Sequence, residues 1–214
     1  VAPAGDIPLT ITRGRTGMVE LSSIDKDASI LYTINKEKKA KQYTEPISMR
    51  DGGTVTAWFA NNPSIKSSVT FKKLETIQTE VIYASSEEVD DGDAKNLVDG
   101  DPTTYWHSMY SVTVAKYPHW VDLDAGEVKT IKGFTYMPRQ DSYNGNIKEY
   151  SIHVSMDGKN WGEPVQKGTF AGNRDEKKVI FSQPVKGRYI RFTALSEQYG
   201  QDYASGAELT ILAE

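Results

Sequence analysis

The stretch NLVDGDPTTYW, Asn96–Trp106, and the tail SGAELTI, Ser205–Ile211, decide how this chain is interpreted. The first segment carries hard oxygen donors on a turn that Gly100 and Pro102 would bend tightly. The tail adds the carboxylate of Glu208 inside an expected last strand. Because Ca²⁺ takes about six to eight oxygen ligands, carboxylates mixed with carbonyls, a shared ion would join the two ends of one domain.

Alternation of apolar and polar residues with period two recurs on both sides of the first segment, and no long segment shows helical periodicity. Short strands separated by frequent turn signals indicate a β-sandwich or jelly roll. We therefore predict an all-β chain with two domains, residues 1–76 and 77–214. The expected strands are Met18–Leu21, Ile30–Ile34, Thr54–Phe59, Ser67–Phe71, Val81–Ala84, Trp120–Leu123, Ile131–Met137, Tyr150–Val154, Lys178–Phe181, Tyr189–Ala194 and Glu208–Leu212.

Composition excludes several classes of partner. The chain has 214 residues, a formal net charge of −4 and no cysteine, so disulfides and thiolate chemistry are excluded. A basic stripe of the kind that binds nucleic acid is missing, and the run Lys36–Lys41 is interpreted as a solvated hairpin tip. We expect no nucleic-acid partner and no membrane insertion, because no apolar run has the length of a membrane span. The start, VAPAG at residues 1–5, is interpreted as a linker remnant of a larger protein.

Five motifs follow one another in a familiar order: NLVDGDPTTYWHS (96–108), HWVDLDAGEVKTIKGFTYMPRQ (119–140), IKEYSIHVSMDGKNW (147–161), GRYIRF (187–192) and GAELTI (206–211). Together they resemble the discoidin-type (coagulation-factor C-type) domain, and more narrowly the family 32 carbohydrate-binding modules of bacterial glycoside hydrolases. The resemblance covers about residues 80–214 and implies a jelly roll of about eight strands. Eukaryotic discoidin domains usually carry a bracketing cysteine pair, so its absence here favours the sugar-binding branch.

The same resemblance implies a structural Ca²⁺ and assigns its ligands residue by residue. Hard oxygens without Cys or His disfavour zinc and copper, and an EF-hand is rejected because its sixth and twelfth positions would be Thr104 and Tyr110. The alternative is a turn stabilised by side-chain caps. The implied ligands are the carbonyls of Asn96, Asp101 and Ala207, the carboxylates of Asp99 and Glu208, and the carbonyl or hydroxyl of Thr104.

A sugar site needs flat aromatic faces for the pyranose ring and converging polar groups for its hydroxyls. The resemblance implies such a site on loops at one end of the sandwich, of a kind that binds galactose-like sugars through the axial hydroxyl. Its candidates are His107, Tyr110, Arg139, Asn144 and Tyr203, with Tyr143 and Tyr199 as competing aromatics.

Each candidate also has a structural alternative. His107 could cap a turn, Arg139 could pair with Asp141, Asn144 could serve only its turn, and Tyr203 could be a surface aromatic. Tyr110 departs from the family pattern, in which Trp is commoner at this position.

The first domain carries a second likeness. The segments ILYTIN (30–35), YTEPI (43–47) and GTVTAWF (53–59) resemble the small immunoglobulin-like domain at the C-terminus of chitobiases and β-hexosaminidases. This likeness spans about Ile7–Leu74 and implies a spacer or packing module. One turn departs from it, because Asn35-Lys36 replaces the usual Asp-Gly.

The chain shows no nucleophile elbow, no zinc-binding His pair and no phosphate loop. A catalytic sugar barrel needs about 250 residues, so we predict no enzymatic activity. We expect a non-catalytic module that binds terminal galactose or N-acetylgalactosamine and targets a covalently linked glycoside hydrolase, in a bacterial extracellular, periplasmic or cell-surface location. The alternative is a discoidin-type protein–protein or cell-surface adhesion module without sugar binding.

Overall fold

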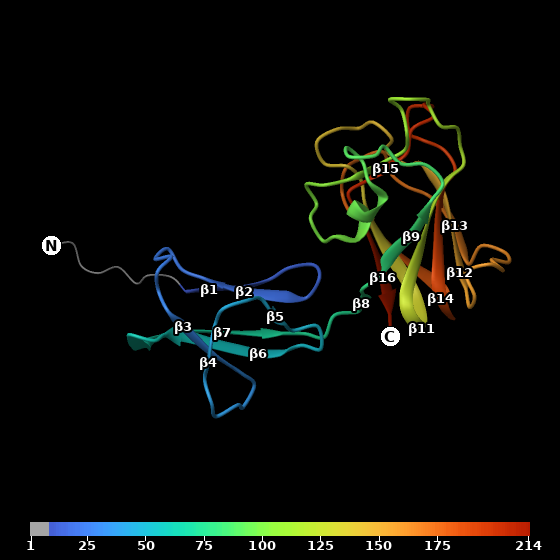
Figure 1. The fold of residues 1–214 in the computed structure, drawn as a ribbon. Helices are drawn as coiled ribbons and strands as arrows, with labels where there is room; N and C mark the ends of the chain where they lie inside the picture. Colours follow the sequence, from blue (N-terminus) through green and yellow to red (C-terminus); the bar gives the residue numbers. More distant parts are fainter. Residues whose placement is uncertain (1–8) are drawn as a thin grey trace. The chain divides into compact units, whose positions relative to one another are not determined.

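The computed structural model describes residues 9–214, and the chain divides after Leu74 into two compact units (Figure 1). The linker remnant expected at residues 1–5 lies outside the described residues. Glu75 and Thr76 belong to the second unit, because the Ala213 N–H donates to the Glu75 carbonyl at 2.8 Å and Thr76 pairs with Leu212.

The first unit consists of two small antiparallel sheets around its own core. Val19, Val55 and Ala57 have no exposed surface. Asn35 takes a left-handed φ of 54°, which Asn tolerates better than most residues, and its Oδ1 accepts a hydrogen bond from the Thr54 N–H at 2.8 Å. One sheet has the order β1-β2-β5 and the other β4-β3-β6-β7; the strands are β1 (Thr10–Arg13), β2 (Met18–Ser22), β3 (Ile30–Ile34), β4 (Lys41–Gln42), β5 (Ile47–Ser48), β6 (Gly53–Phe59) and β7 (Asn62–Phe71).

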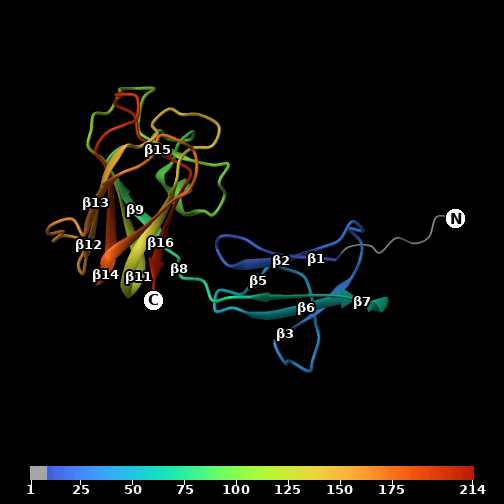
Figure 2. The same cartoon turned by 180° about the vertical axis from the view of Figure 1, so that it is seen from behind.

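The second unit is built on a seven-stranded antiparallel sheet in the order β13-β12-β14-β11-β16-β8, with β9 paired to β11. A separate pair, β10 and β15, lies at the end where the long loops gather (Figures 1 and 2). The elements are β8 (Thr76–Ile77), β9 (Glu80–Ala84), the 3₁₀ turn η1 (Ala94–Val98), β10 (Trp106–His107), β11 (His119–Met137), β12 (Glu149–Ser155), β13 (Gln166–Thr169), β14 (Lys177–Ala194), β15 (Ser205–Gly206) and β16 (Glu208–Ala213).

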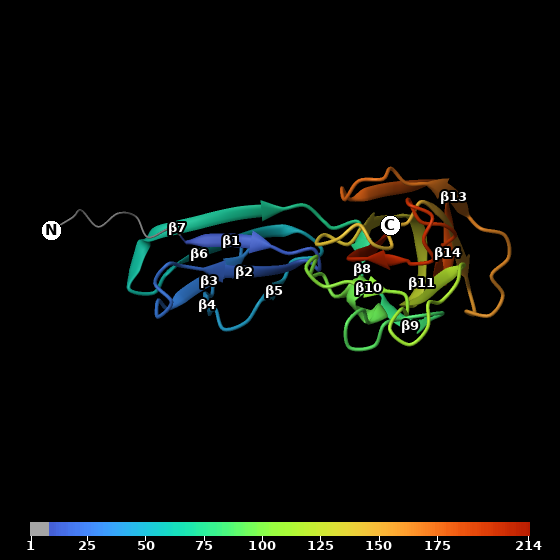
Figure 3. The same cartoon turned by 90° about the horizontal axis from the view of Figure 1, so that it is seen from above.

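The two long strands β11 and β14 pair with each other along both of their halves. The first part of β11 pairs with β9 and its last part with β16, with register shifts between the two parts. Figure 3 shows β9 and β13 at opposite sides of the unit. Gly133 lies at one irregularity, where a Cβ would come 2.2 Å from the Val179 carbonyl oxygen. Each long strand merges two strands that the sequence predicts separately, because a bulge bends the chain without ending its pairing.

Aromatic residues of the two long strands pack together in the core of the second unit. Phe134 and Tyr136 from the last part of β11 each lie 5.7 Å, ring centroid to centroid, from Phe192 of β14. Trp106 is fully buried. Within residues 9–214 the only helical element is η1, so the predicted all-β class is confirmed. In the same range, no helix has the length and apolar character needed to cross a membrane.

Candidate functional site

Three of the predicted sugar-binding residues meet in one aromatic cluster. The His107 ring lies 4.9 Å from the Tyr110 ring at a steep angle of 81° and 5.5 Å from the Tyr203 ring, centroid to centroid. The two tyrosine rings lie 6.4 Å apart. His107 is 3% exposed and Tyr110 is 40% exposed, so a buried histidine lies beside a more accessible tyrosine.

Pairing of β10 with β15 brings these residues together from opposite ends of the domain. His107 lies opposite Ser205 in this pair, and the Ser108 N–H donates to the Ala204 carbonyl at 2.8 Å. Tyr117 fixes the loop that carries Tyr203, because the Tyr117 hydroxyl donates a hydrogen bond to the Tyr203 carbonyl. The buried His119 Nε2 is 2.7 Å from the Asp202 carbonyl oxygen, so His119 has a structural role.

Hydrogen bonding fixes which nitrogen of His107 carries the proton. Its Nδ1 lies 2.7 Å from the Ser108 carbonyl oxygen, and because a carbonyl only accepts, Nδ1 carries the proton and Nε2 keeps a lone pair. Burial lowers the pKa of His107 below its usual value, and the nearby Arg139 charge acts in the same direction. His107 therefore presents a neutral acceptor at neutral pH.

Arg139 pairs with Asp141, as the structural alternative for this residue proposes. Its Nε and Nη2 donate to the two Asp141 carboxylate oxygens at 2.5 and 2.9 Å, and this pairing raises the pKa of the guanidinium. The guanidinium carbon also lies 3.6 Å from the centre of the Tyr105 ring. Asp141 therefore uses two of the five N–H donors of the guanidinium.

Asn144 lies at the same end of the domain but is not part of the aromatic cluster. Its carbonyl accepts a hydrogen bond from Ser205 Oγ at 2.6 Å, and its N–H donates to Ser142 Oγ at 3.1 Å. Gly145 follows with φ 74°, and a Cβ there would lie 2.7 Å from the Ser205 nitrogen. The turn thus holds Asn144 against the strand that pairs with His107.

The structure adds acidic partners that the sequence analysis does not identify. The Tyr110 hydroxyl donates to Asp91 Oδ2 at 2.5 Å, which raises the pKa of Tyr110 to about 12. The Tyr110 and Ser111 N–H groups donate to the buried Glu88 carboxylate at 2.7 and 2.9 Å. The sequence signal is the acidic run EEVDDGD at residues 87–93, which by itself is typical of any solvated loop.

The predicted metal loop and the tail are also neighbours. Trp106 pairs with Gly206, and a Cβ on Gly206 would lie 3.0 Å from Leu97 Cδ2. Glu208, the first residue of β16, is 2% exposed. Asn96, in η1, uses its side-chain amide to donate to the Tyr105 carbonyl at 2.9 Å. Ala207 lies between β15 and β16, and its N–H donates to the Met137 carbonyl at 2.8 Å.

Three oxygens converge within the loop itself. Thr104 Oγ1 lies 2.8 Å from Asp99 Oδ2 and 2.9 Å from the Asp101 carbonyl oxygen. A hydroxyl has one proton and donates to one of these acceptors at a time. Within residues 9–214, no three His, Cys, Asp or Glu side chains gather as a metal cluster. The predicted set uses two carboxylates and otherwise carbonyl or hydroxyl oxygens, so its chemistry suits Ca²⁺ without such a cluster.

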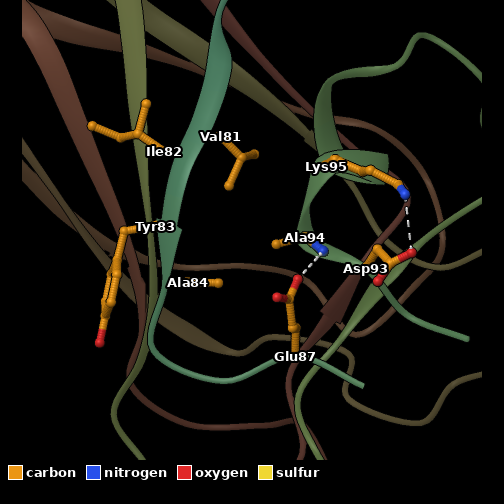
Figure 4. Close-up of a pocket in the computed structure, with 8 residues that line it drawn as sticks. All are labelled: Val81, Ile82, Tyr83, Ala84, Glu87, Asp93, Ala94 and Lys95. Carbon is orange, nitrogen blue, oxygen red and sulfur yellow. Dashed lines mark hydrogen bonds and ion pairs between the residues drawn. The ribbon is translucent and has the colours of Figure 1, made fainter. Parts of the chain in front are cut away.

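A separate hollow of about 290 Å³ lies between β9 and η1 (Figure 4). The Glu87 carboxylate accepts a hydrogen bond from the Ala94 N–H at 2.8 Å, and Lys95 Nζ lies 3.2 Å from Asp93. The charged side chains that line the hollow therefore pair with one another or with the backbone. None of the residues that line it belongs to the aromatic cluster.

Comparison with known proteins identifies the second unit. The family model of the F5/8 type C domain matches residues 81–209. The chain belongs to the F5/8 type C domain family. This confirms the predicted discoidin-type fold class.

Solved relatives narrow the kind of F5/8 type C domain. A module from Clostridium perfringens, CpGH89CBM32-5, was solved with GalNAc-β-1,3-galactose; it is 31% identical, has a TM-score of 0.60, and the match covers 64% of this chain and 99% of that one. The family 32 module of NanJ from C. perfringens, solved with galactose, is 27% identical with a TM-score of 0.57, over 64% of this chain and 96% of that one. The F5/8 type C domain here resembles these family 32 carbohydrate-binding modules.

The curated relatives are longer proteins. A sialidase of Micromonospora viridifaciens is 38% identical over 172 residues, which cover 78% of this chain and 26% of the sialidase. The chain spans about a quarter or less of the lengths of the curated relatives that it matches. The F5/8 type C domain is thus of the non-catalytic family 32 kind, and its relatives include parts of glycoside hydrolases.

Proposed function

We propose that the F5/8 type C domain binds the terminal galactose or N-acetylgalactosamine of a glycan. The observation that carries the proposal is the cluster of His107, Tyr110 and Tyr203, drawn from two loops and beside the Arg139 guanidinium. Galactose and GalNAc-β-1,3-galactose occupy the solved relatives named above, which supports the same sugar class for this chain.

In this proposal the apolar face of the sugar ring packs on Tyr203, and the polar groups read its hydroxyls. His107 Nε2 accepts a hydrogen bond from one hydroxyl, whereas Arg139 donates to another. Asn144, held by its turn, offers its side-chain amide to a third. Tyr110 supplies the second aromatic wall, with its hydroxyl engaged by Asp91.

Titration calorimetry with galactose, N-acetylgalactosamine, glucose and N-acetylglucosamine tests the proposal. We expect the two sugars with an axial 4-hydroxyl to bind with Kd roughly in the micromolar to millimolar range, as suits a small exposed site with few contacts. A preference for glucose or N-acetylglucosamine would overturn the specificity. Failure to bind any sugar on a glycan array would favour the protein-interaction or cell-surface adhesion alternative.

Affinity for galactose is expected to depend on pH through His107. Because burial lowers the pKa of this histidine below 6.5, its neutral form should persist from pH 8 down to about pH 6.5, and affinity should stay level. As the pH falls through the lowered pKa, Nε2 gains a proton and ceases to accept, so affinity should fall. Calorimetry between pH 8 and pH 4.5 measures this profile. A His107→Gln variant keeps an acceptor that does not titrate and should flatten the acid limb; an unchanged limb in that variant would contradict the assignment.

We further propose that a structural Ca²⁺ joins the loop to the tail. Three hard oxygens of the loop lie close together, Thr104 Oγ1, Asp99 Oδ2 and the Asp101 carbonyl oxygen. They support the proposal because Ca²⁺ is bound by oxygens of these kinds. The buried carboxylate of Glu208 on the adjacent tail supports it as well. The proposed ligand set is that implied by the family resemblance: Asn96, Asp99, Asp101, Thr104, Ala207 and Glu208.

The proposed role in the whole protein is targeting. A covalently linked glycoside hydrolase would be held near glycans with terminal galactose, in an extracellular, periplasmic or cell-surface location. The relation to parts of larger sugar-processing proteins supports this. The first unit is proposed as an immunoglobulin-like spacer, supported by its two small sheets and separate core.

A further inference from the structure

A second group of exposed aromatic residues lies outside the cluster described above. Tyr143 is 44% exposed and Tyr199 is 62% exposed. Their ring centroids are 6.4 Å apart and the ring planes cross at 89°. Neither ring belongs to the hydrophobic core of the second unit. Packing of the fold therefore does not explain why these two large side chains are exposed to solvent.

The pair stands on the same loops as the proposed sugar site. Tyr143 immediately precedes Asn144, whose carbonyl is bound by Ser205, the residue opposite His107. Tyr199 shares the connection between β14 and β15 with Tyr203. The ring pair is therefore joined to the first site by short segments of chain on both sides.

The backbone around Tyr199 is held in place. The carboxylate of Glu197, which is buried, accepts hydrogen bonds from the Tyr199 N–H at 2.6 Å and the Gln201 N–H at 3.1 Å. Two hydrogen bonds to one carboxylate restrict the loop before any ligand arrives, which lowers the entropy cost of binding.

A third loop supplies a cation beside Tyr143. The Arg174 guanidinium carbon lies 4.7 Å from the centre of the Tyr143 ring. Arg174 also donates to the Gln140 carbonyl, and Gln140 Nε2 donates back to the Arg174 carbonyl at 3.0 Å. Because Gln140 follows Arg139, this mutual pair ties the second group to the loop of the first site.

We propose that Tyr143, Tyr199 and Arg174 form a second subsite, which takes the next sugar ring of an oligosaccharide whose terminal galactose occupies the first. Exposed tyrosines offer a flat face to the C–H groups of a pyranose and a hydroxyl to its oxygens, and Arg174 offers further N–H donors. The inference rests on the proposed galactose binding. It adds that the site recognises an oligosaccharide that ends in galactose, not only the terminal sugar.

The test compares galactose with galactose-ended disaccharides of β-1,3 and β-1,4 linkage by calorimetry on the full chain. We expect at least one disaccharide to bind about 3- to 10-fold more tightly than galactose, the range that one added aromatic contact supports. Tyr143→Ala and Tyr199→Ala should remove this advantage while changing galactose affinity less than about twofold. Tyr199→Phe keeps the ring and should retain most of the advantage.

A matched control is Tyr83→Ala. Tyr83, on strand β9, is 52% exposed, and its ring contacts one aromatic neighbour, Trp120 of β11. Because Tyr83 is not on the loops of the proposed subsite, its replacement should leave the disaccharide advantage intact. The subsite is overturned if no disaccharide exceeds galactose, or if the tyrosine variants weaken galactose and disaccharide equally. Absence of binding to galactose and to every disaccharide would instead overturn the proposed function, and the subsite with it.

Discussion

Arg139→Ala is expected to weaken galactose binding by about 10- to 100-fold while the chain stays folded, because a hydrogen bond to a charged group contributes roughly 1.5–3 kcal/mol. The guanidinium is held on both sides, by the Tyr105 ring and by the Asp141 carboxylate, and its side chain is 15% exposed. It therefore meets a sugar hydroxyl with little loss of side-chain freedom. Calorimetry gives the affinity, and the melting temperature reports on the fold.

Two further variants separate the charge of Arg139 from its orientation. Arg139→Lys keeps the charge but loses the planar fork, so we expect it to recover only part of the binding. Asp141→Asn keeps the guanidinium but weakens the pairing that orients it, and it should cost less than Arg139→Ala. Equal galactose affinity in the wild type and Arg139→Ala would exclude this residue from the site.

Removal of calcium is expected to lower the melting temperature of the second unit by about 5–10 °C. A ligand at about 100 times its Kd adds about 2.7 kcal/mol to the native state, and a domain of this size shifts by roughly 2–4 °C for each kcal/mol. Because the loop and tail lie far apart in sequence, the loss should affect the whole unit. Scanning calorimetry of the calcium-loaded and chelated protein measures it.

Matched variants distinguish the proposed ligands. Asp99→Ala and Glu208→Ala remove ligating carboxylates and should abolish most of the calcium-dependent shift. Asp101→Asn is the control: its proposed ligand is the backbone carbonyl, whereas its side chain binds Thr103 through hydrogen bonds that an amide oxygen can also accept. It should keep the shift. An identical melting temperature with and without metal, in protein whose calcium content is verified, would argue against a stabilising ion.

Most of the strands can be predicted from the sequence, because alternation of period two marks them directly. The predicted strand Ile30–Ile34 agrees with β3 at both ends. Short pairs such as β10 and β15 are not predicted, since two residues are too few to show a period. These short pairs matter most for the site, because β10 and β15 bring His107 and the tail together.

The sequence allowed us to predict which residues form the candidate site, but only part of their arrangement in space. His107, Tyr110 and Tyr203 meet, whereas Asn144 hydrogen bonds to Ser142 and Ser205 instead of joining the rings. The roles of Asp91 and Glu88 could not be predicted, because an acidic loop residue has no marker for the distant hydroxyl or N–H group that it will bind.

The sequence by itself determines the β character of the chain, the order of its motifs and the oxygen-rich composition of the loop Asn96–Trp106. These are local properties of a residue and its neighbours. Only the tertiary structure decides which exposed tyrosines share a surface: Tyr110 and Tyr203 with His107, and Tyr143 with Tyr199. The physical reason is that loop contacts depend on strand register, and register is set by packing between segments far apart in the sequence, such as those of His107 and Ser205.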